Sequence, residues 1–436
     1  MKNFSFAKRR FLFLQGPPGP FFWLLAQELE QRGHPVFRIN FNGGDRRDWP
    51  GEAVNYRGSR TNWNRYIDRF IRDNKITDIL LFGDCRPLHM AAHGMAKLRG
   101  INIHVFEEGY IRPHWVTMEP DGVNGYSTLT RDPAVLIDQA AHLPPIPPVI
   151  EISSSFKRRM RDALRYYLAD WFNRWRYPHY LSHRHGYLVI EALGWGAKYL
   201  RQALHGNRDA EALARVGEMP YFLFPLQLNS DFQIREHSPF SSMYDAVLYV
   251  LESFTHQSPE RTMLVIKEHP LDCQIRSWRR FIAHHARRLG IEDRVVHIAD
   301  GDLQALAEGS AGLVTVNSTS GTLGLCAGVP VFVLGTAIYD IPGITHQGVL
   351  DEFWRAPQPP QRKVYDAFQR VLHARCLISG GFASESAIKT LIRSTLIRLF
   401  EDPAHMPMRV VPASPSGLHA AAEVFTSASS SGSASG

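Results

Sequence analysis

Short apolar runs alternate with helix-like runs along most of the chain, and no other feature limits its possible folds as strongly. Residues 11–14 have the pattern of a strand, residues 21–32 that of an amphipathic helix closed by Gly33, and residues 35–40 that of the next strand. Strand–helix–strand units of this kind build a parallel sheet with helices on both faces. The pattern therefore predicts an α/β protein with doubly wound, Rossmann-like sheets.

The alternation occurs in two blocks, separated by a stretch of different composition. A chain of 436 residues exceeds an ordinary single core, so we expect two Rossmann-like domains that face a cleft, with a helical insertion between them. The predicted parts are residues 10–150 for the first domain, 151–215 for the insertion, 216–376 for the second domain, 377–405 for a helix that crosses back, and 410–436 for a disordered tail.

Charge and cysteine spacing limit the compartment and the partners. The net charge of +7 and the pI of about 9.2 permit an anionic partner: a nucleotide, a nucleic acid or an acidic lipid. The four cysteines are far apart and form no Cys-x-x-Cys pair, which argues against a zinc site or a disulfide framework. No run of about 20 apolar residues predicts a membrane span, and we expect a cytoplasmic protein.

The insertion is basic and aromatic. Residues 156–185 contain eight Lys or Arg and two Asp, interleaved with Tyr166, Tyr167, Trp171, Phe172, Trp175 and Tyr177. Such a helix can lie on an anionic membrane surface. The alternative is an interdomain helix whose aromatic side chains fill the core. No nucleic-acid recognition motif accompanies the charge, so nucleic acid is not expected as a partner.

Polar residues follow four of the predicted strands. They are Glu107 and Glu108; Gln227, Asp231 and Gln233; Lys267, His269 and Pro270; and Asn317, Ser318, Thr319 and Ser320. Because the carboxyl ends of parallel strands form the ligand-binding edge of an open α/β sheet, we expect these groups to line a common cleft.

The carboxylates in this set have the chemistry of acid, base or nucleophile. Glu107 and Glu108 stand next to each other in a predicted loop, where mutual repulsion raises a pKa toward the range useful for proton transfer. Asp231 is a candidate nucleophile or base, with Gln227 and Gln233 as sugar or nucleotide contacts. The alternative is structural: two solvated loop acids, and an aspartate that caps a turn.

The remaining groups suit a phosphate. Lys267 and His269 carry positive charge or donors, and Pro270 fixes the turn that follows the strand. Residues 317–320 are hydroxyl and amide residues before a predicted helix, where they offer donors to an anion or simply cap the helix. A histidine held in a turn is the corresponding structural alternative for His269.

One motif indicates a metal site only superficially. Asp300-Gly301-Asp302 resembles the Asp-x-Asp metal ligand of some glycosyltransferases. It precedes a predicted helix, however, so helix capping is the preferred interpretation and no metal is expected.

Together the motifs resemble the capsular polysaccharide export proteins of the KpsS/LipB type. The resemblance covers about residues 10–400 and is carried by residues 11–17, 38–45, 106–113, 122–125, 225–227, 231–233, 267–270 and 316–321. It implies a GT-B-like architecture, with an N-terminal acceptor domain and a C-terminal nucleotide-sugar domain.

The resemblance also implies an activity. It is that of a retaining β-Kdo glycosyltransferase of Gram-negative bacteria, which moves Kdo from CMP-Kdo to lysophosphatidylglycerol without a metal or other cofactor. The protein would be peripheral on the inner face of the inner membrane. Its further partners would be a companion Kdo transferase that extends the linker, and the capsule ABC exporter.

The implied roles fall on the residues already singled out. Asp231 would be the nucleophile and Glu107 or Glu108 the acid/base; which of the two acts stays open, because related enzymes often have Asp in this motif. Lys267 and His269 would stabilise the leaving phosphate. The other implied contacts are Ser318, Thr319 and Ser320 for the phosphate, with Asn317 and Pro270 beside them, and Gln15, Gly16, Arg112, Gln227 and Gln233 for substrate.

Two alternatives to a transferase remain. One is a nucleotide-sugar epimerase on the same fold, which would act on the donor without an acceptor. The other is a non-catalytic adaptor of the export machinery that binds glycolipid. Fold alone does not separate them, because this architecture supports many chemistries.

Overall fold

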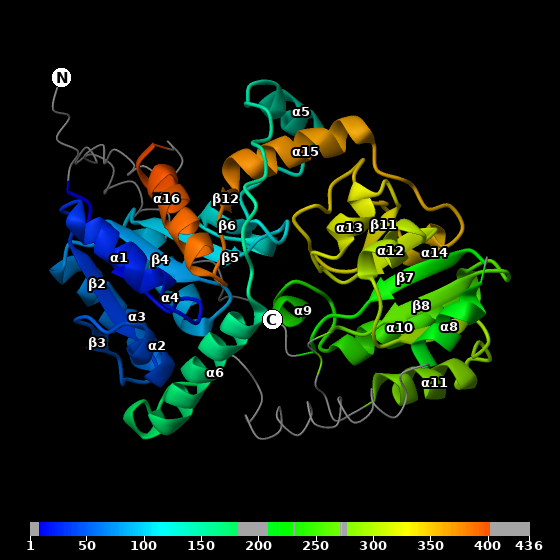
Figure 1. The fold of residues 1–436 in the computed structure, drawn as a ribbon, viewed down its shortest axis with the longest axis horizontal. Helices are drawn as coiled ribbons and strands as arrows, with labels where there is room; N and C mark the ends of the chain where they lie inside the picture. The colour runs from blue at the N-terminus through cyan, green and yellow to red at the C-terminus, as the bar shows by residue number, and fades with distance from the viewer. Residues whose placement is uncertain are drawn as a thin grey trace, which may run out of the picture.

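Two largely parallel sheets form two lobes that stand side by side in the computed structural model (Figure 1). The structure describes residues 8–181, 208–217, 219–229, 232–270, 272 and 277–401. Within these ranges the N-terminal lobe has the sheet order β12-β6-β5-β4-β1-β2-β3, and the C-terminal lobe has the order β11-β10-β7-β8-β9. The predicted α/β class is confirmed, whereas the predicted tail, residues 410–436, lies outside the described residues.

The N-terminal lobe is built on a central apolar strand, β1, which pairs in parallel with β2 and β4. Its strands are β1 (Phe11–Phe13), β2 (Val36–Asn40), β3 (Val54–Asn55), β4 (Asp78–Phe82), β5 (Asn102–Glu108) and β6 (Trp115–Pro120). Its helices are α1 (Phe21–Gln31), α2 (Gly43–Asp48), α3 (Arg60–Asp73) and α4 (Pro87–Leu98), with a short turn η1 (Asn124–Tyr126). Aromatic and aliphatic side chains fill the layers on both faces of the sheet.

The C-terminal lobe repeats the pattern on a smaller parallel sheet. Its strands are β7 (Tyr221–Pro225), β8 (Met263–Lys267), β9 (Val295–Ile298), β10 (Gly312–Thr315) and β11 (Val331–Val333). Its helices are α8 (Arg208–Val216), α9 (Phe232–Glu236), α10 (Met243–Gln257), α11 (Trp278–Arg288), α12 (Leu303–Glu308), α13 (Gly321–Cys326) and α14 (Leu350–Phe353). Strands β8, β9 and β10 are buried along their whole length, as expected for a sheet covered on both faces.

Two antiparallel strands at the edge of the N-terminal sheet were not predicted. β6 pairs with β5, and this pairing extends β5 two residues past its predicted end, because Glu107 lies opposite Thr117 and Glu108 opposite Val116. The expectation that Glu107 and Glu108 lie in a loop is therefore wrong. They are the last two residues of a strand, so their side chains leave opposite faces of the sheet.

The end of the chain returns to the N-terminal lobe. Helix α15 (Arg362–Arg375) packs against α5 (Pro133–Ala141), and β12 (Leu377–Ser379) then pairs with β6. Helix α16 (Glu385–Glu401) buries Ile388, Leu391 and Leu399 in the same core as Phe11 and Phe21. Figure 1 shows α16 beside α1, with α5 and α15 bridging the two lobes.

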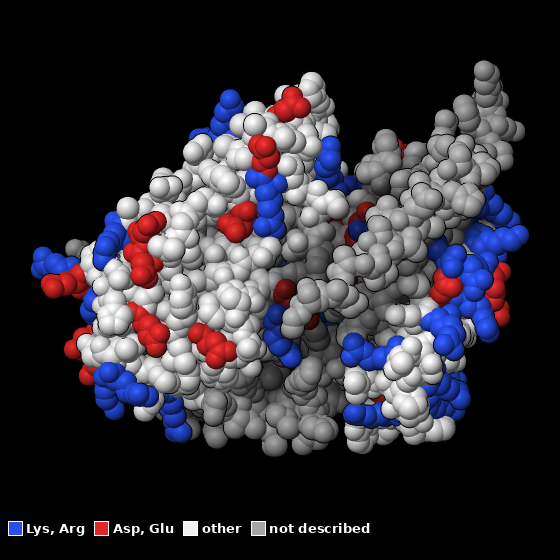
Figure 2. Space-filling model, turned by 180° about the vertical axis from the view of Figure 1, so that it is seen from behind, with Lys and Arg blue, Asp and Glu red and all other residues white. Residues whose placement is uncertain are grey.

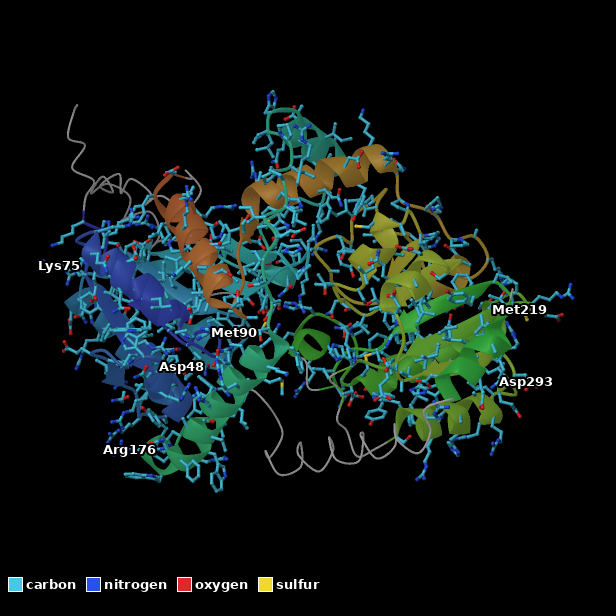
Figure 3. The ribbon with its side chains drawn as sticks, in the orientation of Figure 1. Asp48, Lys75, Met90, Arg176, Met219 and Asp293 are labelled. Atoms are coloured by element: carbon cyan, nitrogen blue, oxygen red, sulfur yellow. The ribbon has the colours of Figure 1, made fainter. Side chains whose placement is uncertain are left out.

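Helix α6 (Phe156–Phe172) and the turn η2 (Arg174–Arg176) lie on the outside of the N-terminal lobe, against α2. Arg176 marks the end that points away from the C-terminal lobe (Figure 3). Within α6, all of which the structure describes, Tyr166 is the only buried side chain. The alternative in which the aromatic residues of this segment fill the core therefore holds for Tyr166 and for Tyr177 beyond the helix, but not for Trp171, Phe172 or Trp175. None of the helices in the described ranges combines the length and the apolar character needed to cross a bilayer.

Candidate functional site

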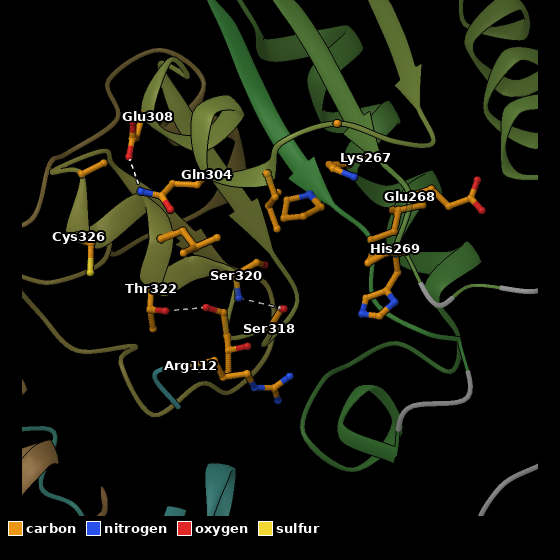
Figure 4. A pocket seen from close by; sticks show the side chains of 18 of the residues that line it. Arg112, Lys267, Glu268, His269, Gln304, Glu308, Ser318, Ser320, Thr322 and Cys326 are labelled. Atoms are coloured by element: carbon orange, nitrogen blue, oxygen red, sulfur yellow. Dashed lines mark hydrogen bonds between the residues drawn. The ribbon is translucent and has the colours of Figure 1, made fainter. Parts of the chain in front are cut away.

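A cleft of about 650 Å³ opens between the lobes. The C-terminal lobe contributes the residues that follow β8 and β10, and the N-terminal lobe contributes Tyr110, Ile111 and Arg112, which follow β5. The residues singled out in the sequence that line the cleft are Arg112, Lys267, His269, Pro270, Asp300, Gly301, Ser318, Thr319 and Ser320 (Figure 4). Of the four predicted groups of polar residues, those after β8 and β10 therefore converge on the cleft, whereas Glu107, Glu108 and Gln227 do not line it.

The β8 end places a buried cation and an imidazole in the cleft. Lys267 is the last residue of β8 and is 5% exposed, and its carbonyl accepts from the backbone N–H of Leu226 at 2.8 Å. The next N–H, that of Glu268, donates to the carbonyl of Ile298 at 2.8 Å. These bonds hold the backbone of residues 267 and 268 from both sides, and His269 follows directly after them in the wall of the cleft.

The hydroxyl residues between β10 and α13 form a second wall. Ser318 Oγ accepts from the backbone N–H of Ser320 at 3.1 Å, and Tyr339 Oη donates to the Ser318 carbonyl. Ser320 occupies the N-cap position of α13 but makes no capping bond. Its buried Oγ has no hydrogen-bond partner among the described residues, so helix capping does not account for this hydroxyl.

Gln227 and Asn317 engage each other rather than the cleft. Gln227 Nε2 donates to Asn317 Oδ1 at 2.8 Å, and the Asn317 backbone N–H donates to Gln227 Oε1 at 3.1 Å. Gln227 is buried and lies outside the residues that line the cleft. The pair ties the end of β7 to the end of β10, so it braces the wall formed by residues 317–320.

The structure separates the two adjacent glutamates. Glu108 forms an ion pair with Arg159 of α6 and lines a different, smaller pocket. Glu107 leaves the other face, where burial, together with the charges of Glu108 and Asp84, raises its pKa to about 7. A carboxyl group with such a pKa exchanges protons readily near neutral pH, which distinguishes Glu107 as the acid/base candidate.

The surroundings of Glu107 adjoin α9 of the opposite lobe. Burial raises the pKa of the Cys85 thiol, and the negative charges of Asp84, Glu236 and Glu107 raise it further. All three carboxylates therefore lie close enough to influence the same thiol. His237, directly after α9, reaches the same cysteine, with its Nε2 3.4 Å from Cys85 Sγ.

Of the predicted sugar-site residues, Gln233 lies in α9 and Asp231 comes just before it in the sequence. Asp231, the predicted nucleophile, immediately precedes α9 and lies outside the described residues, as does the side chain of Gln233.

Gln15 and Gly16 lie away from the main cleft. Gln15 is 3% exposed, and its Nε2 donates to Tyr166 Oη at 2.6 Å and to Tyr180 Oη at 3.0 Å. A Cβ at Gly16 would lie 2.7 Å from the ring of Phe22, so glycine permits close packing there. These positions support the fold of the lobe, and Gln15 lines a small separate pocket.

Sequence reasoning missed Arg86, which lines that pocket together with Gln15, Arg60 and Tyr180. Its buried Nη1 has no hydrogen-bond partner in the described ranges. The signal was available, since Asp84-Cys85-Arg86 follows β4 just as the other groups follow their strands. A guanidinium group with an unused buried donor suits an anionic ligand.

In the Asp-x-Asp stretch, Asp300 and Gly301 line the cleft, whereas Asp302 caps a helix. Asp302 caps α12, where its Oδ1 accepts from the backbone N–H of Gln304 at 2.9 Å and that of Ala305 at 3.3 Å. Asp300 Oδ1 accepts from the N–H of Gly301 at 2.8 Å. In the part of the chain that the structure describes, no three His, Cys, Asp or Glu side chains are grouped as a metal site.

Comparison with known proteins places these motifs in context. The family model for capsule polysaccharide biosynthesis proteins matches residues 77–382. The chain is 36% identical to the capsule polysaccharide export protein KpsS of Escherichia coli over 370 residues, which are 84% of this chain and 94% of that protein. It is 35% identical to the capsule polysaccharide modification protein LipB of Neisseria meningitidis serogroup B over 402 residues, which are 88% and 94%. The resemblance inferred from the motifs is thus confirmed.

Solved structures with a related arrangement include two kinds of protein. The β-Kdo 2,7 transferase KpsC of Thermosulfurimonas dismutans superposes with a TM-score of 0.42 at 14% identity, covering 88% of this chain and 99% of that one. A putative UDP-N-acetylglucosamine 2-epimerase of Listeria monocytogenes gives 0.30 at 12% identity, covering 91% and 97%.

Proposed function

The chain belongs to the family of capsule polysaccharide biosynthesis proteins, and on that premise we propose that it is a glycosyltransferase. Its donor is CMP-Kdo and its acceptor is lysophosphatidylglycerol, so that it places the first β-Kdo of a linker that carries a capsule polymer. It works at the inner face of the inner membrane, before a companion transferase and the exporter. The donor, acceptor and location extend the resemblance of the motifs.

One observation carries the proposal: the cleft brings together a buried lysine, a histidine and a serine hydroxyl that has no hydrogen-bond partner within the described ranges. Lys267, His269 and Ser320 lie in the C-terminal wall, opposite Arg112 of the N-terminal lobe. Such preorganised donors stabilise the charge that develops on a departing phosphate. They favour a nucleotide-phosphate leaving group, and the proposal needs no metal.

The carboxylates carry out the bond changes in two steps. In the first, the carboxylate of Asp231 attacks the anomeric carbon of Kdo, and CMP departs with the electrons of the broken C–O bond. In the second, the acceptor hydroxyl attacks the same carbon and displaces Asp231, while Glu107 takes the hydroxyl proton. Two displacements retain the anomeric configuration.

The acceptor occupies the N-terminal lobe, beside Arg86. Arg86 Nη1 has no hydrogen-bond partner among the residues that the structure describes, and Arg60 lines the same pocket. A phosphodiester is the group in the acceptor that such a pocket suits. Glu107 is within reach of the charge of Arg86, which supports an acceptor bound between the two.

Mass spectrometry of the products tests the function directly. The full chain is incubated with CMP-Kdo and a short-chain lysophosphatidylglycerol; the expected product is the acceptor plus one Kdo, with release of CMP. Conversion of CMP-Kdo in the absence of acceptor would favour an epimerase instead. Capsule assembly that survives both Asp231→Ala and His269→Ala would favour the adaptor.

A further inference from the structure

Helix α6 presents a row of large apolar side chains to solvent. Met160, Leu164, Leu168, Trp171, Phe172 and Trp175 are 41%, 52%, 38%, 58%, 65% and 73% exposed. They recur every three or four residues, so they lie along one side of the helix and of the turn η2 that follows. These six residues are called the α6 stripe below.

The opposite side of α6 is firmly seated. Tyr166 Oη donates to Asp45 Oδ1 at 2.8 Å and accepts from Gln15 at 2.6 Å and from Asn42 at 3.0 Å. A Cβ at Gly43 would overlap the backbone of α6 at Ala169, so the two helices are in close contact. Because the opposite side of α6 is packed against the lobe, the α6 stripe faces solvent even though the helix is firmly held.

Basic side chains flank the α6 stripe. Lys157, Arg161, Arg165 and Arg174 are exposed, whereas the two acids of α6, Asp162 and Asp170, are half-buried. The helix thus shows solvent an apolar row and positive charge, with no exposed carboxylate of its own. Seen from behind, Lys and Arg also gather on the side of the N-terminal lobe (Figure 2).

We infer that the α6 stripe and its flanking basic residues form a docking surface for an anionic lipid bilayer, with α6 lying in the plane of the membrane interface. Apolar side chains enter the boundary between headgroups and acyl chains, and the basic side chains contact lipid phosphates. A second copy of the chain fits this surface less well, because a symmetric contact would bring the two rows of arginines together.

The docking surface also connects with the proposed acceptor site. Gln15, which bonds to the seated side of α6 through Tyr166, lines the pocket of Arg86. Docking would bring that pocket close to the lipid from which an acceptor is drawn; this step alone rests on the proposed function. The inference of a docking surface rests only on the exposure of the α6 stripe and the charge of the basic residues beside it.

Flotation of the full chain with vesicles tests the inference. The probes are vesicles of phosphatidylcholine alone and vesicles of phosphatidylcholine with phosphatidylglycerol. We expect binding to the anionic vesicles, weakened by salt. The double variant Leu164→Asp with Leu168→Asp should lower the affinity for vesicles at least tenfold, because it removes two leucine side chains that would be buried in the bilayer. The double variant Arg161→Glu with Arg165→Glu should also lower it roughly tenfold.

A matched control is Leu98→Asp, since Leu98 is 79% exposed at the end of α4, outside the α6 stripe. It should bind like wild type, and circular dichroism should show all variants folded. Equal binding to neutral vesicles, no binding, or stripe variants that behave like Leu98→Asp would overturn the inference. So would a wild-type dimer that the stripe variants convert to monomer while their vesicle binding stays unchanged.

The result is independent of catalysis. Flotation needs no donor, and Glu107→Gln should float like wild type whether or not it transfers sugar. If the chain docks but no Kdo product forms, the proposed function fails and the docking surface stands. If product forms with soluble acceptor but the chain does not float with vesicles, the docking surface fails and the proposed function stands.

Discussion

Replacing Glu107 by glutamine should inactivate the enzyme and stabilise the fold at the same time. The glutamine has nearly the shape of glutamate but cannot take a proton from the acceptor hydroxyl. A positioned acid/base contributes about 10²- to 10⁴-fold to rate, and the turnover of Glu107→Gln should fall by that factor. The stabilisation follows from the raised pKa of Glu107.

The magnitude follows from the environment of Glu107. Burial raises its pKa from 4.5 to about 7, and one pKa unit is worth about 1.4 kcal/mol. Ionising this carboxyl therefore costs about 3 kcal/mol more in the folded protein than in the unfolded chain. Between these two pKa values the folded state holds more protons, so the wild type loses stability as pH rises.

The sign of the effect makes the test specific. The neutral glutamine does not lose stability in this way as the pH rises. The free energy of unfolding of Glu107→Gln should therefore exceed that of wild type by less than about 1 kcal/mol at pH 5 and by about 3 kcal/mol at pH 8. Guanidinium unfolding at both pH values measures it. Glu108→Gln is the matched control: it removes a partly exposed ion pair with Arg159, worth less than about 1 kcal/mol, and should keep most activity. A pH-independent difference, or an active Glu107→Gln, would refute the reasoning.

Three further substitutions probe the phosphate side of the cleft. Lys267→Ala should lower kcat/KM by roughly 10²-fold and weaken CMP binding in calorimetry, because the leaving phosphate loses the buried lysine that stabilises its charge. An unchanged CMP affinity would contradict this role. Ser320→Ala should stabilise the ligand-free protein by about 1 kcal/mol, since its buried hydroxyl has no described partner, yet bind CMP more weakly; a loss of stability would show that the hydroxyl is already satisfied. Gly321→Ala should lower stability by about 1–3 kcal/mol, because the new Cβ would overlap Tyr339 Oη; a normal melting temperature with full CMP affinity would show that the wall tolerates displacement.

The alternation of strands and helices predicted most elements of both sheets within a few residues. What it missed depends on partners distant in sequence. β12 has three residues and pairs with residues about 260 positions earlier; nothing local marks such an edge pair. The pairing of β6 with β5 moved Glu107 and Glu108 from a loop into a strand, which placed their side chains on opposite faces of the sheet.

In the candidate site, too, some features were predictable from the sequence and others depended on contacts between distant residues. Polar residues after parallel strands converge because sheet geometry requires it, so Lys267, His269 and Ser320 were predictable as lining residues. The mutual bonding of Gln227 and Asn317 was not, since either amide alone is equally compatible with a ligand. For α6, composition allowed two interpretations, and only the exposure of Trp171 and Trp175 separates them.

The return of β12 and α16 makes the C-terminal lobe an insertion within the N-terminal one. During synthesis on the ribosome, residues 8–120 emerge long before residues 377–401, so β6 waits as an open sheet edge while the other lobe is made. The core that receives Ile388 and Leu399 is likewise unfilled until the end. An open edge is a template for wrong pairing, so a chain that stops before residue 377 would leave the first lobe, rather than the last, incomplete and prone to aggregate.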